Sequence, residues 1–435
     1  MLRRDKMGSL AKWRKEPWLV VVVITAILIA LVAFRNSVYP HPGSELPHLI
    51  AEDSDQYRMM AIGNTQDVIA PFAKRFLYPF LVRCLFVSTG LPLNLCFMFF
   101  DLAGLVLLTY CLAKILIEFG LSPWIASVFL LTPVTVDQIE LGYLPDLFHA
   151  GLMALFFLML QLHRYIWALL TLALCFMTRE DTMACAAILG LLAWRRNHRV
   201  LAIGALGVIL FGMAFGSWCL RSGHTNIHGL PDFCYLALKL PYNFLKNVLG
   251  CSIWTNVLTG VGEPFLKFTL PHCLQWGGDR EIGLCYPEAG RPLFTLISLL
   301  SLFGSGPLIL WANRRMKLWS DDHPLMVQLV FIYGLCVYFL GTSLGDWVDR
   351  LIGHSWPLFW ICIPYLLAKR QPPFRIKETR ALVLSLIIIA WLPSLLNYSR
   401  YASNLWALAT LTILVIAYVF AAKQLRKIPN REVST

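Results

Sequence analysis

Three carboxylates crowd into a short polar stretch after the first apolar run of this chain, where Glu52, Asp53 and Asp55 precede Tyr57. A carboxylate made more basic by neighbouring negative charge can act as a general base, and several carboxylates together can ligate a divalent cation. Acidic residues also favour the first turn of a helix. The cluster is therefore typical of a reactive centre or of a helix start.

Two cations follow in the sequence K-R-F-L-Y-P at positions 74–79. Arg75 could hold a phosphate group, since a guanidinium matches two phosphate oxygens at once. Long basic side chains at a membrane surface also extend towards lipid headgroups without any further role. Phosphate binding and membrane anchoring both stand as interpretations of Arg75.

Two more polar pairs interrupt apolar sequence. Asp146 lies three residues before His149, a spacing that puts both side chains on one face of a helix. Asp146 could equally cap that helix. Arg179 and Glu180 lie in a short polar turn at 178–181, where they form either a purely structural salt bridge or part of a site.

The elements that position these residues are membrane-spanning helices, because 58% of the 435 residues are apolar, 14% are charged and the mean hydropathy is +0.64. An ordinary soluble domain carries about 25% charged residues. The net charge of +12 comes from Lys and Arg that lie between apolar runs, so nucleic acid is not an expected partner. We predict an all-α polytopic membrane protein with about 12 transmembrane helices. The predicted spans are 17–34, 91–114, 122–136, 147–162, 165–177, 182–194, 200–218, 292–311, 324–340, 356–367, 381–396 and 405–421.

The basic residues predict the orientation of these spans. A basic stretch precedes the first span and Arg35 follows it in place of a small-residue cleavage site, which predicts a retained anchor with a cytoplasmic amino terminus. Alternating from there puts the basic loops 195–199, 314–317 and 369–380 and the carboxyl terminus in the cytoplasm, as the positive-inside rule requires. No eukaryotic sorting tail is evident, which favours the bacterial inner membrane.

Two apolar segments, 165–177 and 182–194, are each about 20 Å long as helices, against a hydrocarbon core of about 30 Å. We predict a helical hairpin whose turn at 178–181 faces the outer side. The segment 76–90 contains Pro79 and Arg83 and is predicted to lie along the outer face. These assignments bring all four polar elements to the outer side of the membrane.

The chain is expected to have three parts. Residues 1–218 form a membrane domain with the first exterior loop, residues 219–291 a large exterior loop, and residues 292–435 the carboxyl-terminal membrane helices. The large loop holds five cysteines, so an oxidising exterior would allow up to two disulfides whose pairing stays open. The chain has no paired Cys or Cys/His spacing of a zinc site.

A family resemblance covers about the first 200 residues. Three patterns follow the first span: D-x-x-x-Y at 53–57, A-x-G at 61–63 and R-x-L-x-P at 75–79. Together with Pro-Asp at 145–146 and Thr-Arg-Glu at 178–180, their order resembles the GT-C membrane glycosyltransferases. The resemblance extends to the bacterial polyprenyl-phosphate-sugar transferases that carry aminoarabinose or mannose. It implies a GT-C-like fold, a polyprenyl-phosphate-linked sugar as donor, and an acceptor of unknown identity on the exoplasmic or periplasmic side.

The resemblance also implies roles for individual residues. Asp53 would be the catalytic base with Asp55 as the alternate, and Arg75 and Arg179 would bind the donor phosphate. Supporting roles fall to residues that flank these groups, namely Tyr57, Asp146, His149 and Glu180. No cofactor is required; a divalent cation is compatible with the carboxylates, and its ligands are unknown.

Other classes stay open from the sequence. A secondary transporter or lipid flippase would fit the number of spans, but such folds have paired repeats with broken helices in matching places, and the hairpin here has no counterpart. A polymerase or ligase of surface polysaccharide would place catalytic residues in a late loop, here Arg350 and His354. A non-catalytic membrane subunit is the remaining class.

Overall fold

The structure is a computed structural model of the whole chain, and the contacts within it divide the protein into two compact units. The first unit comprises Met1–His224, Arg315–Tyr333 and Pro357–Pro372, and the second comprises Thr225–Arg314, Gly334–Trp356 and Pro373–Thr435. The three parts expected from the sequence stay a prediction. The residues described are 17–38, 48–65, 68, 70–140, 143–220, 240–241, 243–249, 252–255, 273–276, 282–285, 290–303, 317–344, 348–370, 387–391 and 404–427.

Helices make up the described part of the first unit. They are α2 (Pro17–Val38), α3 (His48–Ile62), α4 (Ala70–Ala73), α5 (Leu77–Thr89), α6 (Leu93–Glu118), α7 (Ile125–Leu130), α8 (Pro133–Glu140), α9 (Asp146–Gln161), α10 (Tyr165–Phe176), α11 (Thr182–Arg195), α12 (Arg199–Leu220), the first half of α17 (Leu325–Leu344), the π-helical turn η3 (Leu358–Cys362) and α19 (Ile363–Arg370).

Three described helices are long and apolar enough to cross a membrane: Leu93–Glu118, Arg199–Cys219 and Leu325–Ser343. Several shorter apolar helices accompany them, α9, α10 and α11 among them. These helices indicate a membrane protein. The predicted span 122–136 is wrong as a single helix, because α7 ends at Leu130 and α8 begins at Pro133. Proline lacks the N–H that a continuous helix would need and suits a first helical position, so the chain breaks before it.

Helices α6 and α9 of the first unit cross closely at two glycines. A Cβ on Gly104 would lie 2.6 Å from the backbone oxygen of Leu147, and one on Gly151 would lie 2.5 Å from the backbone oxygen of Gly104. Small residues allow such close backbone approach in membrane helices. The crossing holds the first turn of α9, including Asp146, against α6.

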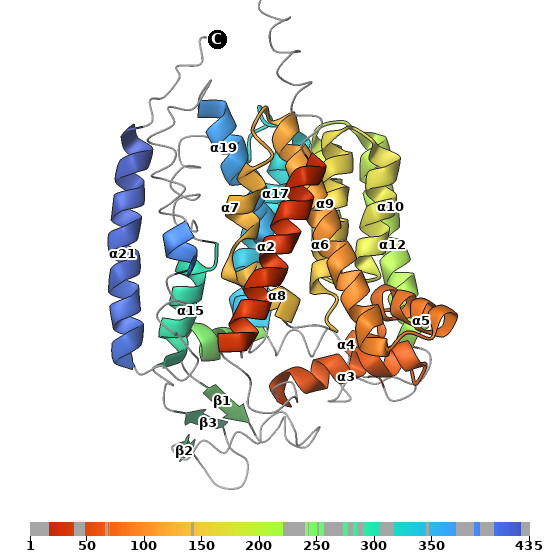
Figure 1. The fold of residues 1–435 in the computed structure, drawn as a ribbon, viewed down its shortest axis with the longest axis horizontal. Helices are drawn as coiled ribbons and strands as arrows, with labels where there is room; N and C mark the ends of the chain where they lie inside the picture. Colours follow the sequence, from red (N-terminus) through yellow and green to blue (C-terminus); the bar gives the residue numbers. More distant parts are fainter. Residues whose placement is uncertain are drawn as a thin grey trace, which may run out of the picture. The chain divides into compact units, whose positions relative to one another are not determined.

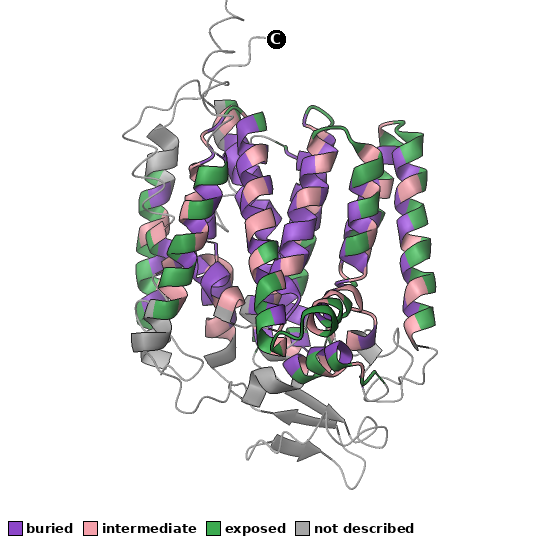
Figure 2. Ribbon diagram, turned by 45° about the vertical axis from the view of Figure 1, so that its right-hand side comes forward, coloured by how far each residue is buried: buried purple, intermediate pink, exposed green. Residues whose placement is uncertain are grey.

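Short helices lie across one end of the upright helices. Figures 1 and 2 show α3 and α5 lying across the end of α6, α10 and α12 instead of running alongside them. Helix α5 ends at Gly90, whose φ of +68° is a left-handed conformation that glycine adopts without strain. That 76–90 lies along the outer face of the membrane stays a prediction.

The predicted helical hairpin is present as α10 and α11, joined by residues 177–181. Its turn contacts the start of α5, where the backbone N–H of Leu77 donates to the carbonyl of Met177 over 3.0 Å. The sequence R-x-L-x-P therefore reaches the polar turn of the hairpin. This contact brings together two of the elements singled out in the sequence.

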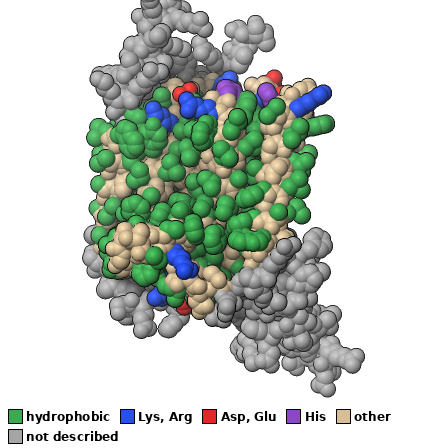
Figure 3. Space-filling view, turned by 90° about the vertical axis from the view of Figure 1, so that its right-hand side faces the viewer, with side chains coloured by type: hydrophobic (Ala, Val, Ile, Leu, Met, Phe, Trp, Pro, Cys, Tyr) green, Lys and Arg blue, Asp and Glu red, His purple; other side chains and the backbone are tan. Residues whose placement is uncertain are grey.

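Burial separates the helices of the first unit into inner and outer ones (Figure 2). Most of α9 is buried, whereas α10 and α12 expose large apolar side chains, including Ile166 (73% exposed) and Ile203 (65% exposed). Figure 3 shows that this face is a hydrophobic band with basic and histidine side chains at its upper edge. Such a band between polar rims is the surface that a helical protein presents to lipid.

The described part of the second unit combines helices with a small sheet. Its helical elements are η1 (Leu245–Leu249), α15 (Gly290–Ser301), the second half of α17, α18 (Val348–Gly353) and α21 (Asn404–Lys427). The strands β1 (Ser252–Thr255), β2 (Cys273–Trp276) and β3 (Ile282–Cys285) form an antiparallel sheet in the order β1-β3-β2. The expectation of a purely helical protein therefore needs correction within 219–291. Predicted disulfides in that loop stay a prediction, since Cys234 and Cys251 lie outside the described residues.

Candidate functional site

Arg75 joins three segments that are far apart in the sequence. Its Nε and Nη2 donate to the two carboxylate oxygens of Glu180 over 2.8 and 2.7 Å, and its Nη1 donates to the hydroxyl of Tyr57 over 3.0 Å. The guanidinium also lies 5.4 Å from the ring centre of Phe72. A two-pronged pairing of this kind fixes the orientation of both side chains. Arg75 therefore ties α3 and the start of α5 to the hairpin turn.

The electrostatics of the pair favour its charged form. Burial raises the pKa of Glu180, but the charge and hydrogen bonds of Arg75 outweigh burial and lower that pKa to about 2. Burial likewise lowers the pKa of Arg75, and the charges and hydrogen bonds of Glu180 and Tyr57 reverse this and raise it. The side chain of Arg75 is 13% exposed and that of Glu180 is 44% exposed, so water screens the glutamate end of the pair.

A second ion pair lies deeper beside the first. Arg179 Nη1 donates to Asp146 Oδ1 over 2.5 Å, and the two residues are only 6% and 4% exposed. Arg179 Nε lies 3.5 Å from Asp181 Oδ1. Asp146 begins α9, while Arg179 and Asp181 belong to the hairpin turn. This pair joins the start of α9 to the same turn that Arg75 reaches from the other side.

His149 completes the buried group on the next turn of α9. Its Nδ1 lies 2.7 Å from Thr178 Oγ1, and Thr178 Oγ1 donates to the carbonyl of Cys175 over 2.6 Å. Because the threonine proton is used in that bond, His149 Nδ1 is the donor to Thr178. Nε2 of His149 then faces Asp181 Oδ1 at 3.9 Å. This separation is longer than a hydrogen bond, whereas the imidazole is hydrogen-bonded to Thr178.

The carboxylates of α3 separate into two environments. Asp53 precedes the buried Tyr57 by four residues and is half-buried on the same side of the helix. Asp55 points away: its side chain is 55% exposed and lies 3.4 Å from Arg58. Because Tyr57 contacts Arg75, the face that carries Asp53 is the one directed at the ion pairs. The geometry favours Asp53 over Asp55 as the candidate base.

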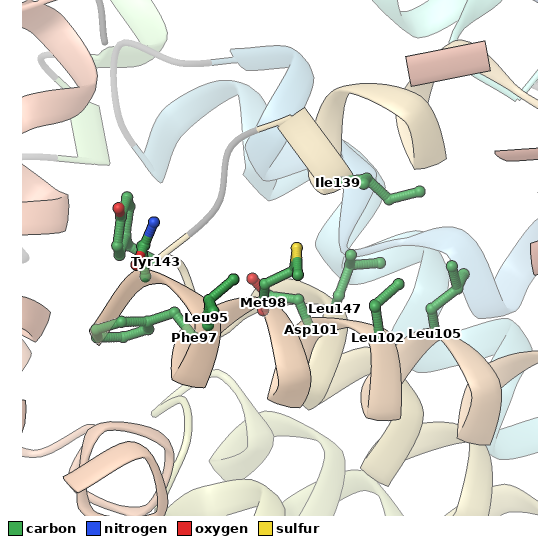
Figure 4. Close-up of a pocket in the computed structure, with 10 residues that line it drawn as sticks. Leu95, Phe97, Met98, Asp101, Leu102, Leu105, Ile139, Tyr143 and Leu147 are labelled. Atoms are coloured by element: carbon green, nitrogen blue, oxygen red, sulfur yellow. The ribbon is translucent and has the colours of Figure 1, made fainter. Parts of the chain in front are cut away.

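A buried hydrogen bond that sequence reasoning missed lies beside this group. Tyr78 donates to Asp101 Oδ1 over 2.7 Å, and Asp101 is 7% exposed. Asp101 lines a largely apolar pocket of about 250 Å³ between α6, α8 and the start of α9 (Figure 4). Leu147, which directly follows Asp146, lines the same pocket. The pocket therefore adjoins the start of α9, where Asp146 pairs with Arg179.

Further residues of the cluster also carried no signal in the sequence. Asp181 reads as part of a polar turn, and its contacts with Arg179 and His149 appear only in the folded chain. Tyr333, on the first half of α17, is 1% exposed and lies within electrostatic range of Asp181 and Arg179. A single tyrosine in an apolar span does not distinguish itself from a core residue.

Arg350 and His354, the residues considered for a polymerase or ligase, belong to the second unit and are each 8% exposed. Both side chains are therefore buried within the second unit, although the sequence places them in a loop.

Comparison with protein-family models, with curated proteins and with solved structures finds no match for this chain.

Within the described part of the chain, no three His, Cys, Asp or Glu side chains come close enough to hold a metal ion. The cluster around the hairpin turn combines the guanidiniums of Arg75 and Arg179 with the carboxylates of Glu180, Asp146 and Asp181. Guanidiniums can hold a phosphate and carboxylates can accept a proton. Arg75 uses its Nε, Nη1 and Nη2 in the bonds to Glu180 and Tyr57, so an anion that binds this guanidinium shares or replaces those hydrogen bonds.

Proposed function

We propose that the chain is an integral-membrane glycosyltransferase that moves a sugar from a polyprenyl-phosphate donor to an acceptor on the exoplasmic or periplasmic side. The observation that carries the proposal is the convergence of four sequence patterns on one polar cluster: Arg75 contacts Tyr57 and Glu180, and Arg179 contacts Asp146. These are the patterns on which the resemblance to the GT-C family rests. A fold of about 12 spans in a bacterial inner membrane is part of the same proposal.

In this reaction Asp53 takes the proton of the acceptor hydroxyl as the oxygen attacks the anomeric carbon of the sugar. The bond from that carbon to the donor phosphate breaks on the opposite side, and the polyprenyl phosphate leaves with the electron pair. A single displacement of this kind inverts the anomeric configuration. Guanidinium groups stabilise the negative charge that grows on the leaving phosphate.

Of the two arginines, Arg75 is the better placed to bind the phosphate. Its partner Glu180 is 44% exposed and can turn towards solvent, whereas the partner of Arg179 is the buried Asp146. Removing a carboxylate from a buried pair costs far more than removing one from a solvated pair. Donor binding therefore exchanges Glu180 for phosphate at Arg75, and Arg179 holds the hairpin turn and start of α9 in position.

The donor's lipid part needs an apolar surface beside the phosphate. The pocket of about 250 Å³ next to Asp101 and Leu147 offers one, and Leu95 and Met98 at its edge are 42% and 52% exposed on α6. Figure 4 shows these side chains along one face of the helix. The first isoprene units of the donor could occupy this pocket while the rest of the chain stays in the bilayer.

The test is transfer from a radiolabelled polyprenyl-phosphate sugar by the purified full chain, with wild-type protein compared with Asp53→Asn and Asp55→Asn. Asp53→Asn keeps the size of the side chain but removes its basicity, so turnover should fall about 10² to 10⁴-fold. Asp55→Asn is the matched control on the same helix, and its exposed side chain predicts an effect below about threefold. Full activity of Asp53→Asn would exclude it as the base, and equal losses in both variants would indicate a shared ion or a coupled pair.

A further inference from the structure

A second pocket, of about 1000 Å³, lies at the other end of α10, away from the hairpin turn at 177–181. It forms where the α9–α10 turn meets the α11–α12 turn. Its polar lining consists of the half-buried Tyr165 and of five exposed side chains, namely His163, Arg164, Asn197, His198 and Arg199. No acidic residue is among the described residues that line it. The permanently charged side chains among its described lining residues are therefore both arginines, Arg164 and Arg199.

The two turns are built alike, which sets the positions of the basic side chains. His163 and Asn197 have φ of 57° and 60°, the left-handed conformation that ends α9 and α11. The next backbone N–H returns to the preceding helix in both cases: Arg164 donates to Met159 over 2.9 Å and His198 to Ala193 over 2.8 Å. Basic side chains consequently stand at the starts of both α10 and α12.

Tyr165 connects the two turns. Its hydroxyl lies 3.1 Å from His163 Nδ1, and its ring centre lies 6.0 Å from that of His198. Helices α10 and α12 also pack against each other directly. This ring contact and the packing of α10 against α12 bring the two turns side by side, and an arginine from each lines the pocket.

Below the basic rim the pocket is apolar and open to the outside. Ile166 is 73% exposed, Trp167 is 61% exposed and Val200 is 78% exposed. These side chains continue into the exposed apolar faces of α10 and α12. Figure 3 shows basic and histidine side chains gathered at the edge of the hydrophobic band on this side of the molecule.

We propose that this pocket binds an anionic phospholipid, with Arg164 and Arg199 contacting the headgroup phosphate and Trp167 and Val200 contacting the start of the acyl chains. A phosphate matches paired guanidiniums, and an acyl chain matches the apolar surface directly below them. Basic pockets between membrane helices bind anionic headgroups in this way. The proposal is independent of the chemistry at the hairpin turn, which lies at the opposite end of α10.

The test uses the purified full chain in detergent, titrated separately with dioleoyl phosphatidylglycerol, dioleoyl phosphatidylcholine and inorganic phosphate. Thermal unfolding reports stabilisation, and native mass spectrometry counts the retained lipids. Phosphatidylglycerol should raise the unfolding temperature and stay bound at a low lipid ratio, since a ligand that binds the folded state stabilises it. Phosphatidylcholine and inorganic phosphate should do neither at equal concentration.

The diagnostic variant is Arg164→Gln with Arg199→Gln. Each basic side chain near an anionic lipid surface is worth about fivefold in affinity, so the double variant should need about 25-fold more phosphatidylglycerol for half-maximal stabilisation. Both side chains are exposed, so the fold should tolerate the change. Arg164→Lys with Arg199→Lys keeps the charges and should retain most of the response.

The matched control removes two exposed cations of the first unit outside the pocket, through Lys317→Gln with Lys369→Gln. Lys317 lies two residues before Trp319, whose carbonyl accepts a hydrogen bond from Arg195 at the end of α11, so it shares this end of the molecule. The control should respond to phosphatidylglycerol as the wild type does. Three results would overturn the proposal: an equal response to phosphatidylcholine, an equal loss in the control, or full stabilisation by inorganic phosphate.

Discussion

Replacing Arg179 with methionine would take the guanidinium away from the buried carboxylate of Asp146. Methionine keeps much of the length and apolar stem of arginine but carries no charge. Arg179 and Asp146 are 6% and 4% exposed and share a contact of 2.5 Å, so little water can replace the lost partner. The main perturbation is therefore the loss of this buried pair, and Asp181 and Glu180 also lose a nearby positive charge.

The size of the effect follows from this burial. Removing one member of a buried ion pair typically costs about 3 to 5 kcal/mol, because the remaining charge is left in a medium of low polarity. Asp181, which lies 3.5 Å from Arg179 Nε, also loses that neighbour. Asp181 keeps His149 Nε2 at 3.9 Å and its side chain is 21% exposed, so its contribution should be smaller. We expect Arg179→Met to lower the free energy of unfolding by about 3 to 5 kcal/mol.

A second substitution separates the charge from the packing. In Arg179→Met with Asp146→Leu, both charges are gone, and apolar replacement of a whole buried pair is often neutral or stabilising. The double variant should recover to within about 1 kcal/mol of the wild type by chemical unfolding in detergent. Its transfer activity per folded protein should stay within about tenfold of wild type, whereas Arg75→Met should lose about 10² to 10³-fold as a phosphate ligand.

Two measurements would refute this reasoning. If Arg179→Met lowered the free energy of unfolding by less than about 1 kcal/mol, Arg179 would not be needed to stabilise the buried carboxylate of Asp146. A double variant that unfolds as easily as the single one would mean that shape, not charge, makes this contact important. A stable but inactive double variant would instead place Arg179 at the donor phosphate.

Three further outcomes are expected. Arg75 lowers the pKa of Glu180 from 4.5 to about 2, so the pair stabilises the folded state above pH 4.5 and this stabilisation is lost as the pH falls towards 2. The difference in the free energy of unfolding between wild type and Glu180→Gln should therefore be constant from about pH 5 to 8 and should shrink below about pH 5. Cysteine in place of Glu180, whose side chain in the hairpin turn is 44% exposed, should react with an impermeant thiol reagent added from outside in a protein without native thiols, and reaction from the cytoplasmic side alone would reverse the hairpin. Gly104→Ala should cost more than about 2 kcal/mol because its Cβ would meet backbone at 2.6 Å, while Gly207→Ala, with nothing within 4 Å, should be neutral or slightly stabilising.

The apolar helices could be predicted from the sequence because the composition and length of each segment determine whether it forms such a helix. The short segments at 165–177 and 182–194 are separate helices, α10 and α11, since the charged turn between them cannot continue an apolar span. The break inside 122–136 was also readable in principle, because Pro133 marks the start of α8. A hydropathy window averages over such a proline, which explains the error.

Partners in the cluster could not be predicted, because they depend on how helices approach one another. Arg75 and Glu180 are separated by 105 residues, and only the contact between the start of α5 and the hairpin turn brings them together. The sequence predicted only that both groups lie at the same depth in the membrane. The sequence contains no information on which helices are neighbours in the plane of the membrane, so it could not decide whether Arg75 binds a phosphate or pairs with a carboxylate.

Lateral position depends on residues that have no chemistry of their own. Gly104 and Gly151 let the backbones of α6 and α9 meet, and this crossing puts Asp146 next to the hairpin turn where Arg179 reaches it. A larger residue at either glycine would move the start of α9 outward and separate the inner ion pair without changing any charged group. The arrangement of the polar cluster therefore depends on the packing of two apolar helices, and a variant of Gly104 should disturb Asp146 and Arg179 before it disturbs Arg75.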